Sequence, residues 1–275
     1  MAEDINKAVA YEIDDGIATI TLDRPEEGNS INRDLAGGMA AAWKDVRENP
    51  EVRVVIITGR GDRHFCTGAS VSGLKTGEAG SGLDNGRLRD VVKLSSIQNA
   101  VWKPVICVVN GLCVGGGLHF VVDADIVIAS ENAAFMDTHV NVGQVGAIEN
   151  IGLARRMTLG GALLLTLAGR AHRMPAARAH QLGLIDLLEP TPADALARAR
   201  ELALAIAKNS PQALALSKQA IWGAMEMGYT AAMEQGWNLL KLQWHHPDFA
   251  EGPRAFMEKR DAIWNPDPNA RREDR

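Results

Sequence analysis

Cysteine is scarce in this 275-residue chain, occurring only as Cys66, Cys107 and Cys113. No pair has the C-x-x-C spacing of a redox or zinc motif, and an odd number of cysteines indicates free thiols rather than a disulfide framework. The first residues also lack a basic region followed by an apolar run, so no secretory signal is expected. These absences predict a protein of a reducing compartment, with the cytoplasm as the default.

Long apolar runs and an excess of positive charge are also missing. No apolar stretch reaches the roughly 18 residues that span a bilayer. The 29 Lys and Arg are outnumbered by 34 Asp and Glu, and the formal net charge is -5. The chain therefore has no overall basic field for nucleic acid or anionic lipid, and we expect neither a nucleic-acid nor a membrane partner.

The N-terminal part carries strand and helix patterns in succession. Residues 9–13 and 17–22 are rich in β-forming residues and flank Asp14-Asp15-Gly16, which predicts a β-hairpin. Apolar residues recur at helical spacing between Arg33 and Arg47, which predicts an amphipathic helix. A further helix is predicted over Leu88 to Val101.

Three β-branched runs, at residues 52–58, 105–110 and 126–129, have the nearly continuous apolar character of strands covered on both faces. Their alternation with helices predicts parallel strand–helix–strand units and an α/β fold. After about Asn150 the main strand pattern is at residues 184–188, and three or four helices are predicted up to Trp264. This pattern divides the chain into an α/β core (1–200), a C-terminal helical region (201–265) and a flexible tail (266–275).

Three consecutive glycines, Gly115-Gly116-Gly117, follow one of the predicted strands and precede a helical pattern. Glycine at such a junction allows positive φ and close approach of a ligand, and a helix start supplies unpaired N–H donors. The triplet can therefore form a site for a negatively charged oxygen. The glycines can equally serve only tight packing of helix on strand, and the sequence alone leaves both readings open. A dinucleotide fingerprint and a Walker lysine are absent.

A second glycine turn, Cys66-Thr67-Gly68-Ala69-Ser70, follows another predicted strand. Two turns from adjacent strands can point their N–H groups at a single oxygen, which is worth several kcal/mol if that oxygen becomes charged in a transition state. The glycine-rich segment 73–86, just beyond this turn, reads as a mobile surface loop. We predict that it borders the pocket of the bound substrate.

The order and spacing of several segments resemble the enoyl-CoA hydratase/isomerase (crotonase) family, from about residue 9 to about residue 264. Each motif alone is modest, and their order makes the resemblance specific. The segments are L-D-R-P (22–25), V-V-I-I-T-G (54–59), F-C-T-G-A (65–69), 103–117 from K-P-V-I to the glycine triplet, D-A-D-I-V-I-A (123–129), 168–186 and 251–260.

The resemblance implies a crotonase-like spiral of ββα units with a C-terminal helical trimerisation region, and a homotrimer or hexamer. It implies that the N–H groups of Ala69 and Gly116 form an oxyanion hole for a thioester carbonyl. The substrate would be an acyl-CoA, with coenzyme A arriving as part of the thioester and no permanently bound cofactor. No metal site is expected.

The resemblance also implies positions for coenzyme A. Arg24 and the segment Thr67-Gly68-Ala69 would lie near its nucleotide, and Phe256 and Lys259 would line its site from the C-terminal helices. The alternatives are that Arg24 is a solvated turn residue and that Lys259 is a surface charge on a helix.

Hydratases of the family use two glutamates, and this chain has His119 and His139 at the corresponding positions. Imidazole exchanges protons near neutral pH, so the two histidines can act as acid and base. A carboxylate beside each ring would orient it. Glu149 is the candidate carboxylate, and Asp137 is the alternative.

Three functions remain open at this point. The favoured one is an enoyl-CoA hydratase or isomerase with histidines in place of glutamates. The second is a hydrolase that cleaves a C–C bond or the thioester through water activated by a histidine and a carboxylate. The third is a coenzyme A-binding protein without catalysis.

Overall fold

The computed structural model describes residues 3–70, 87 and 91–272. Its centre is a seven-stranded sheet in the order β1-β2-β3-β4-β6-β8-β11. The strands are β1 (Glu3–Asn6), β2 (Val9–Asp14), β3 (Ile17–Leu22), β4 (Val54–Gly59), β6 (Val105–Val109), β8 (Ile126–Ser130) and β11 (Leu187–Glu189). β1 to β3 are antiparallel, and every pairing from β3 to β11 is parallel. The predicted hairpin and the three predicted buried strands are confirmed.

The residues of the hairpin turn suit its backbone conformation. Asp15 and Gly16 both have positive φ, 51° and 76°, which is the requirement of the tight turns that match strand twist. Aspartate and glycine tolerate that conformation. β2 and β3 are therefore fixed in register by their turn, with Asp14 opposite Ile17.

A second, four-stranded sheet has the order β10-β9-β7-β5. Its strands are β5 (His64–Cys66), β7 (Leu112–Val114), β9 (Ala134–Met136) and β10 (Met174–Pro175). The chain passes from β4 to β5, from β6 to β7 and from β8 to β9, so each of three long central strands continues into a short strand of the second sheet. This repeat makes the architecture a stack of related units, and the α/β fold is confirmed.

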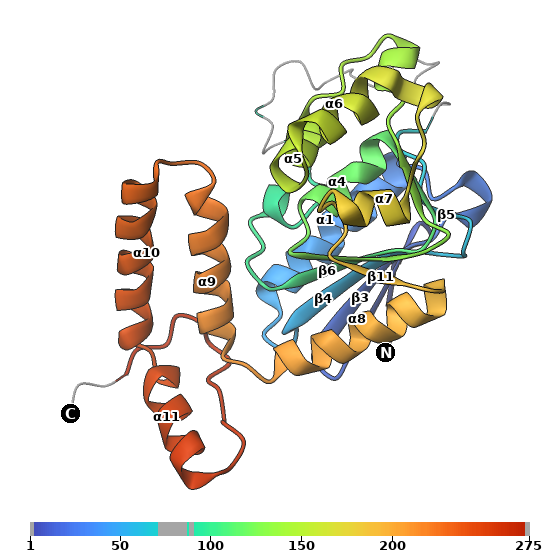
Figure 1. Ribbon diagram of the computed structural model, residues 1–275. Coiled ribbons are helices and arrows are strands. Elements are labelled where there is room, and N and C mark those ends of the chain that lie inside the picture. The colour runs from blue at the N-terminus through green and yellow to red at the C-terminus, as the bar shows by residue number, and fades with distance from the viewer. Residues whose placement is uncertain (1–2, 71–86, 88–90, 273–275) are drawn as a thin grey trace.

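Helices cover both faces of the large sheet (Figure 1). The described α-helices are α1 (Arg33–Glu48), α4 (Leu118–Val122), α5 (Ile148–Arg156), α6 (Leu159–Ala168), α7 (Ala176–Gln181), α8 (Pro192–Ala207), α9 (Pro211–Ala224), α10 (Tyr229–Trp244) and α11 (Asp248–Glu258). Short 3-10 turns are η1 (Pro25–Glu27), η2 (Ile97–Asn99), η3 (Gly115–Gly117), η4 (His139–Val142) and η5 (Gly169–Ala171). No helix in the described ranges is both long and apolar enough to cross a membrane.

The core follows from the alternation of side chains along the strands. Val54 and Ile56 face Ala195 and Ala199 of α8, in a cluster of small and β-branched residues. Their neighbours in β4 face the other side, where Trp43 of α1 belongs to the larger cluster. Because β4 is buried on both faces, its first four residues are all apolar and β-branched.

Two predictions of local structure were wrong. The predicted helix does not extend over residues 92–101: among the described residues 91–101 only Val91 is α-helical, and the 3-10 turn η2 follows. Polar side chains compete for the backbone here, since Asn99 donates to the carbonyl of Ser95 and Gln98 accepts from two N–H groups. After Asn150 the described chain holds more helices than the three or four predicted, since α6 and α7 are short and separated by η5. Segment 73–86 lies outside the described residues.

The last helices, α9 to α11, stand beside the α/β core (Figure 1). α8, which spans the predicted boundary at residue 200, packs on the sheet instead. The segment after Pro266, predicted to be a flexible tail, carries hydrogen bonds to the helical region: the carbonyl of Asp267 lies 2.9 Å from Nε2 of His246, and the Arg272 N–H donates to the His245 carbonyl.

Candidate active site

Three short strands gather the predicted site segments. β5, β7 and β9 are parallel neighbours in the second sheet, so their carboxyl ends meet at one edge. Beyond β5 the chain forms Thr67-Gly68-Ala69, beyond β7 it forms η3, and beyond β9 it reaches Asp137 and His139. α4 starts directly after η3 and carries His119. Segments far apart in the sequence therefore converge at this edge.

The turns at Ala69 and Gly116 touch backbone to backbone. Ala69 forms an isolated bridge with Ile31, whose N–H donates to the Gly68 carbonyl at 2.7 Å, and the alternation of a strand turns the Ala69 N–H to the opposite side. Gly68 has φ 81°, and a Cβ there would lie 3.0 Å from the Gly116 nitrogen. A Cβ on Gly116 would lie 3.6 Å from the Ala69 nitrogen. Neither N–H donates a hydrogen bond to another described residue.

A buried carboxylate lies between two imidazole rings. Glu149, in the first turn of α5, is only 5% exposed. Its Oε2 lies 3.5 Å from Nε2 of His119, and its Oε1 lies 3.2 Å from Nε2 of His139. We call these three residues the histidine–glutamate cluster. One carboxylate therefore contacts both rings, and in each ring the contacting atom is Nε2.

His139 has a second carboxylate partner. Its Nδ1 lies 2.6 Å from Oδ1 of Asp137, and its backbone N–H donates to the same oxygen at 3.1 Å. The Asp137 hydrogen bond is the largest influence on His139 and raises its pKa, against the effect of burial. Burial alone would raise the pKa of Asp137, but hydrogen bonds from His139 and Asn150 lower it below its usual value. A Cβ on Gly115 would lie 3.4 Å from Cε1 of His139, so this ring borders the glycine triplet.

His119 is held by a residue that sequence reasoning did not single out. Its Nδ1 lies 3.0 Å from Nε2 of Gln98 in η2. The other amide atom of Gln98, Oε1, accepts the N–H groups of Leu94 and Ser95 at 2.9 and 3.1 Å. Burial lowers the pKa of His119, although Glu149 and other nearby groups act on it too. Sequence analysis predicted a helix over this segment, so Gln98 was treated as one residue of a helix face and was not considered a site residue.

Comparison with known proteins identifies the family. The enoyl-CoA hydratase/isomerase family matches residues 12–267. The chain belongs to this family. It is 33% identical over 258 residues to (E)-benzylidenesuccinyl-CoA hydratase of Thauera aromatica, covering 92% of this chain and 96% of that protein. It is 30% identical over 259 residues to carnitinyl-CoA dehydratase of Salmonella enteritidis PT4, covering 90% and 94%. A crystal structure of an enoyl-CoA hydratase/isomerase from Mycobacterium paratuberculosis matches with a TM-score of 0.85 at 33% identity, covering 94% of this chain and 99% of that one.

The protein is therefore an acyl-CoA enzyme of the enoyl-CoA hydratase/isomerase type. Histidines stand at the two positions where the resemblance expects glutamates, and both rings lie against Glu149. A carboxylate is thus present in this enoyl-CoA hydratase-like site, but it comes from α5.

The residues predicted to bind coenzyme A lie less close together than the members of the histidine–glutamate cluster. The Arg24 guanidinium donates to the Ser30 carbonyl at 2.6 Å and forms an ion pair with Glu27, so its side chain is only 12% exposed. Thr67 and Gly68 lie beside the site, and the Thr67 N–H donates to the Gly28 carbonyl at 3.0 Å. The role of Arg24 at a nucleotide stays a prediction.

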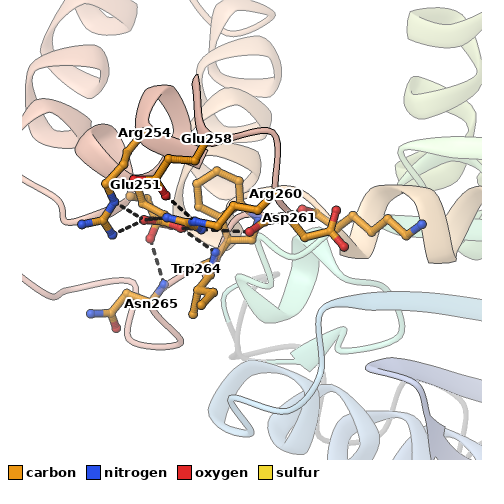
Figure 2. A network of polar contacts seen from close by, with 10 residues as sticks. Glu251, Arg254, Glu258, Arg260, Asp261, Trp264 and Asn265 are labelled. Atoms are coloured by element: carbon orange, nitrogen blue, oxygen red, sulfur yellow. Dashed lines mark hydrogen bonds and ion pairs between the residues drawn. The ribbon is translucent and has the colours of Figure 1, made fainter. Parts of the chain in front are cut away.

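Phe256 lies on α11 and Lys259 directly follows it, and this helix is far from α4 and α5 in the single chain (Figure 1). Phe256 is 86% exposed. Lys259 ends the helix with φ 53°, and the following turn is fixed by Glu251, which accepts from Arg260 and Arg254 (Figure 2). These hydrogen bonds, that of Arg260 first, hold the pKa of Glu251 well below its usual value. The single chain does not bring Phe256 and Lys259 to the histidine–glutamate cluster.

A cavity of about 610 Å³ lies elsewhere, between α5 and α9. Its lining includes Ile151 and Arg155 of α5, and Lys218 and Trp222 of α9. Lys218 pairs with Asp125 at 2.7 Å. No member of the histidine–glutamate cluster lines this cavity, so it is separate from the candidate active site.

Proposed function

We propose that the enzyme holds the carbonyl oxygen of an acyl-CoA thioester between the N–H groups of Ala69 and Gly116 and adds water to, or removes it from, the neighbouring C–C bond. Glu149 is the group that exchanges protons with substrate and water. The observation that carries this assignment is the contact of one Glu149 carboxylate with Nε2 of both His119 and His139, at 3.5 and 3.2 Å.

The hydrogen-bonding capacity of these groups favours Glu149 over the histidines. A ring nitrogen has room for one hydrogen bond, whereas a carboxylate oxygen has two lone pairs. Nδ1 of His119 is hydrogen-bonded to Gln98 and Nδ1 of His139 to Asp137, and Nε2 of each ring lies against a Glu149 oxygen. Glu149 alone keeps acceptor capacity for a water or a substrate proton. The earlier assignment, with the histidines as acid and base, is the alternative.

In the hydration direction, Glu149 takes a proton from water as the oxygen attacks Cβ. The electrons of the double bond move onto the thioester oxygen, where the two N–H groups stabilise the negative charge. The enolate then takes a proton at Cα, and the new hydroxyl remains at Cβ. With Nδ1 of His139 hydrogen-bonded to Asp137, its Nε2 lies 3.2 Å from Glu149, so a proton taken up by this pair is held close to the substrate and is available for return to Cα.

A hydrolase is the second candidate, and one observation favours it. The contact of Asp137 with Nδ1 of His139 at 2.6 Å is the arrangement in which a carboxylate orients a general base. Water activated there could attack a carbonyl carbon and cleave a C–C bond or the thioester.

One assay panel separates these functions. With an enoyl-CoA such as crotonyl-CoA, a hydratase lowers the absorbance of the conjugated thioester, whereas a hydrolase releases a free thiol or a new carboxylic acid. Binding of coenzyme A without turnover would favour a non-catalytic protein. The names of the relatives suggest adding benzylidenesuccinyl-CoA and carnitinyl-CoA to the panel.

We further propose that the chain works as a homotrimer or hexamer. Large apolar side chains are exposed on α10, among them Met233, Trp237 and Leu240. Such a surface is typical of a subunit interface. Assembly could bring Phe256 and Lys259 of one subunit towards the coenzyme A of another, while Arg24 and Thr67 approach it from the subunit that holds the acyl group. Buried free thiols suit a cytoplasmic location.

A further inference from the structure

The side-chain amide of Gln98 is held in place by hydrogen bonds to the backbone before and beside it. Its Oε1 accepts from the backbone N–H groups of Leu94 and Ser95, and the Leu94 carbonyl in turn accepts from the Trp43 indole at 2.6 Å. Ser95 donates to the Asp123 carboxylate at the end of α4. The amide group therefore has little freedom to rotate.

These contacts fix which amide atom faces His119. An oxygen that accepts two N–H groups cannot be the amide nitrogen, so the atom 3.0 Å from Nδ1 of His119 is the NH₂ group of Gln98. That group can only donate. Nδ1 of His119 must then be an unprotonated acceptor, and the ring proton must be on Nε2, which faces Glu149 at 3.5 Å.

We propose that Gln98 is a positioning residue: by donating to Nδ1 it holds His119 as the neutral Nε2–H tautomer, so that the Nε2–H group faces Glu149 and His119 cannot take the proton that Glu149 collects. The proton exchanged with substrate then moves only between Glu149 and His139. This role rests on the proposed function of Glu149.

The electrostatic surroundings explain why such a residue is needed. Glu149 of α5 and Asp123 at the end of α4 both favour a charged His119, while burial and His139 oppose it. These opposing effects alone would allow His119 to be charged or to be neutral in either tautomer. The Gln98 donor excludes a proton at Nδ1, and so excludes both the imidazolium and the wrong tautomer.

The first test needs only the wild-type enzyme. Two-bond ¹⁵N–¹H correlation spectra of the histidine rings distinguish the tautomers, and the His119 signals are assigned by their loss in His119→Gln. We expect a neutral Nε2–H ring at neutral pH. A ring protonated at Nδ1, alone or in addition to Nε2, would overturn the proposal.

The second test uses Gln98→Glu, which keeps an oxygen for the two N–H groups but places an acceptor at Nδ1. His119 should become protonated at Nδ1, and kcat for hydration of an enoyl-CoA should fall at least about tenfold with KM nearly unchanged. Gln181→Glu, which adds the same charge on exposed α7, is the matched control. An unchanged kcat in a Gln98→Glu enzyme whose His119 has gained the Nδ1 proton would refute the positioning role.

The two proposals fail separately. If Glu149→Gln keeps full activity, the proposed function is wrong, whatever the tautomer of His119. If Glu149→Gln is inactive but the wild-type His119 carries its proton on Nδ1, only the role of Gln98 is wrong. Should Gln98→Glu not fold, the wild-type spectrum still decides.

Discussion

Oε1 of Glu149 lies 3.2 Å from Nε2 of His139, and this contact determines where the mobile proton of the site can be. Nδ1 of His139 is committed to Asp137 at 2.6 Å. The free side of the ring, at Nε2, therefore faces the Glu149 carboxylate, and a proton can pass between the two groups across this contact. A proton held in this way can leave to a substrate without unpairing either group from its other partners.

Glu149→Gln should lower kcat by about 10²- to 10⁴-fold while leaving the fold intact. The amide oxygen can still accept from His119, and the amide nitrogen can donate to a neutral His139, so the contacts survive while the exchangeable proton is lost. The measurement is steady-state hydration of crotonyl-CoA, with unfolding by urea to confirm stability. Glu201→Gln, on the exposed side of α8, is the control. Full activity of Glu149→Gln would return the acid and base roles to the histidines.

Gly116→Ala should inactivate the enzyme without unfolding it. The new methyl group would lie 3.6 Å from the Ala69 nitrogen, in the space that the thioester oxygen needs, and 3.3 Å from Cδ1 of Ile31, a side-chain end that can move. We expect a loss of about 10²- to 10³-fold in kcat, the usual effect of losing an oxyanion donor. Gly37→Ala in α1, where a methyl meets nothing within 4 Å, should keep full activity and add about 0.5–1 kcal/mol of stability. Equal activities of the two variants would contradict the oxyanion site.

The stability that His139 contributes should decline as the pH rises. The folded protein raises the pKa of His139 above its ordinary 6.5, mainly through the Asp137 hydrogen bond. Protonation is therefore favoured in the folded state, so the stabilisation is complete below 6.5 and is lost as the pH passes the folded pKa. The free energy of unfolding of wild type minus that of His139→Gln should shrink as the pH rises from 6.5 through the raised pKa of the folded protein. His180→Gln, on exposed α7, is the control, and a difference that grows with pH would contradict the assignment.

The three thiols should be unreactive in the folded enzyme. Cys66, Cys107 and Cys113 are buried, and burial raises the pKa of Cys66 to about 12 and raises the pKa of the other two as well. Since the thiolate is the reactive form, a disulfide reagent should label none of them until denaturant is added, and then all three. Rapid labelling of the native protein would show that the second sheet, where Cys66 and Cys113 lie in neighbouring strands, opens readily.

Much of the fold could be predicted from local pattern, because buried parallel strands such as β4 have nearly continuous apolar sequences and the hairpin turn needs residues that tolerate positive φ. The segment around Gln98 could not. Its backbone is decided by side chains that bond to nearby N–H and carbonyl groups, and helical spacing does not reveal such competition. The number of short helices after Asn150 was missed for a related reason, since each is too short for a clear period.

For the site, sequence order and glycine spacing led to the right neighbourhood, because the ends of β5, β7 and β9 meet at one edge. The partners within it were harder to foresee. The sequence allowed either Glu149 or Asp137 as the carboxylate beside a histidine, and the structure has both, on opposite nitrogens of His139. Such a relay depends on how α5 packs beside α4, which is a tertiary relationship.

The most direct test is a crystal structure of the assembled enzyme with a slowly reacting acyl-CoA. We predict that the thioester oxygen lies about 2.7–3.1 Å from the nitrogens of both Ala69 and Gly116, with Cα or Cβ of the acyl group next to the Glu149 carboxylate. A thioester oxygen bound away from these two nitrogens, or an acyl group out of reach of Glu149, would contradict the account.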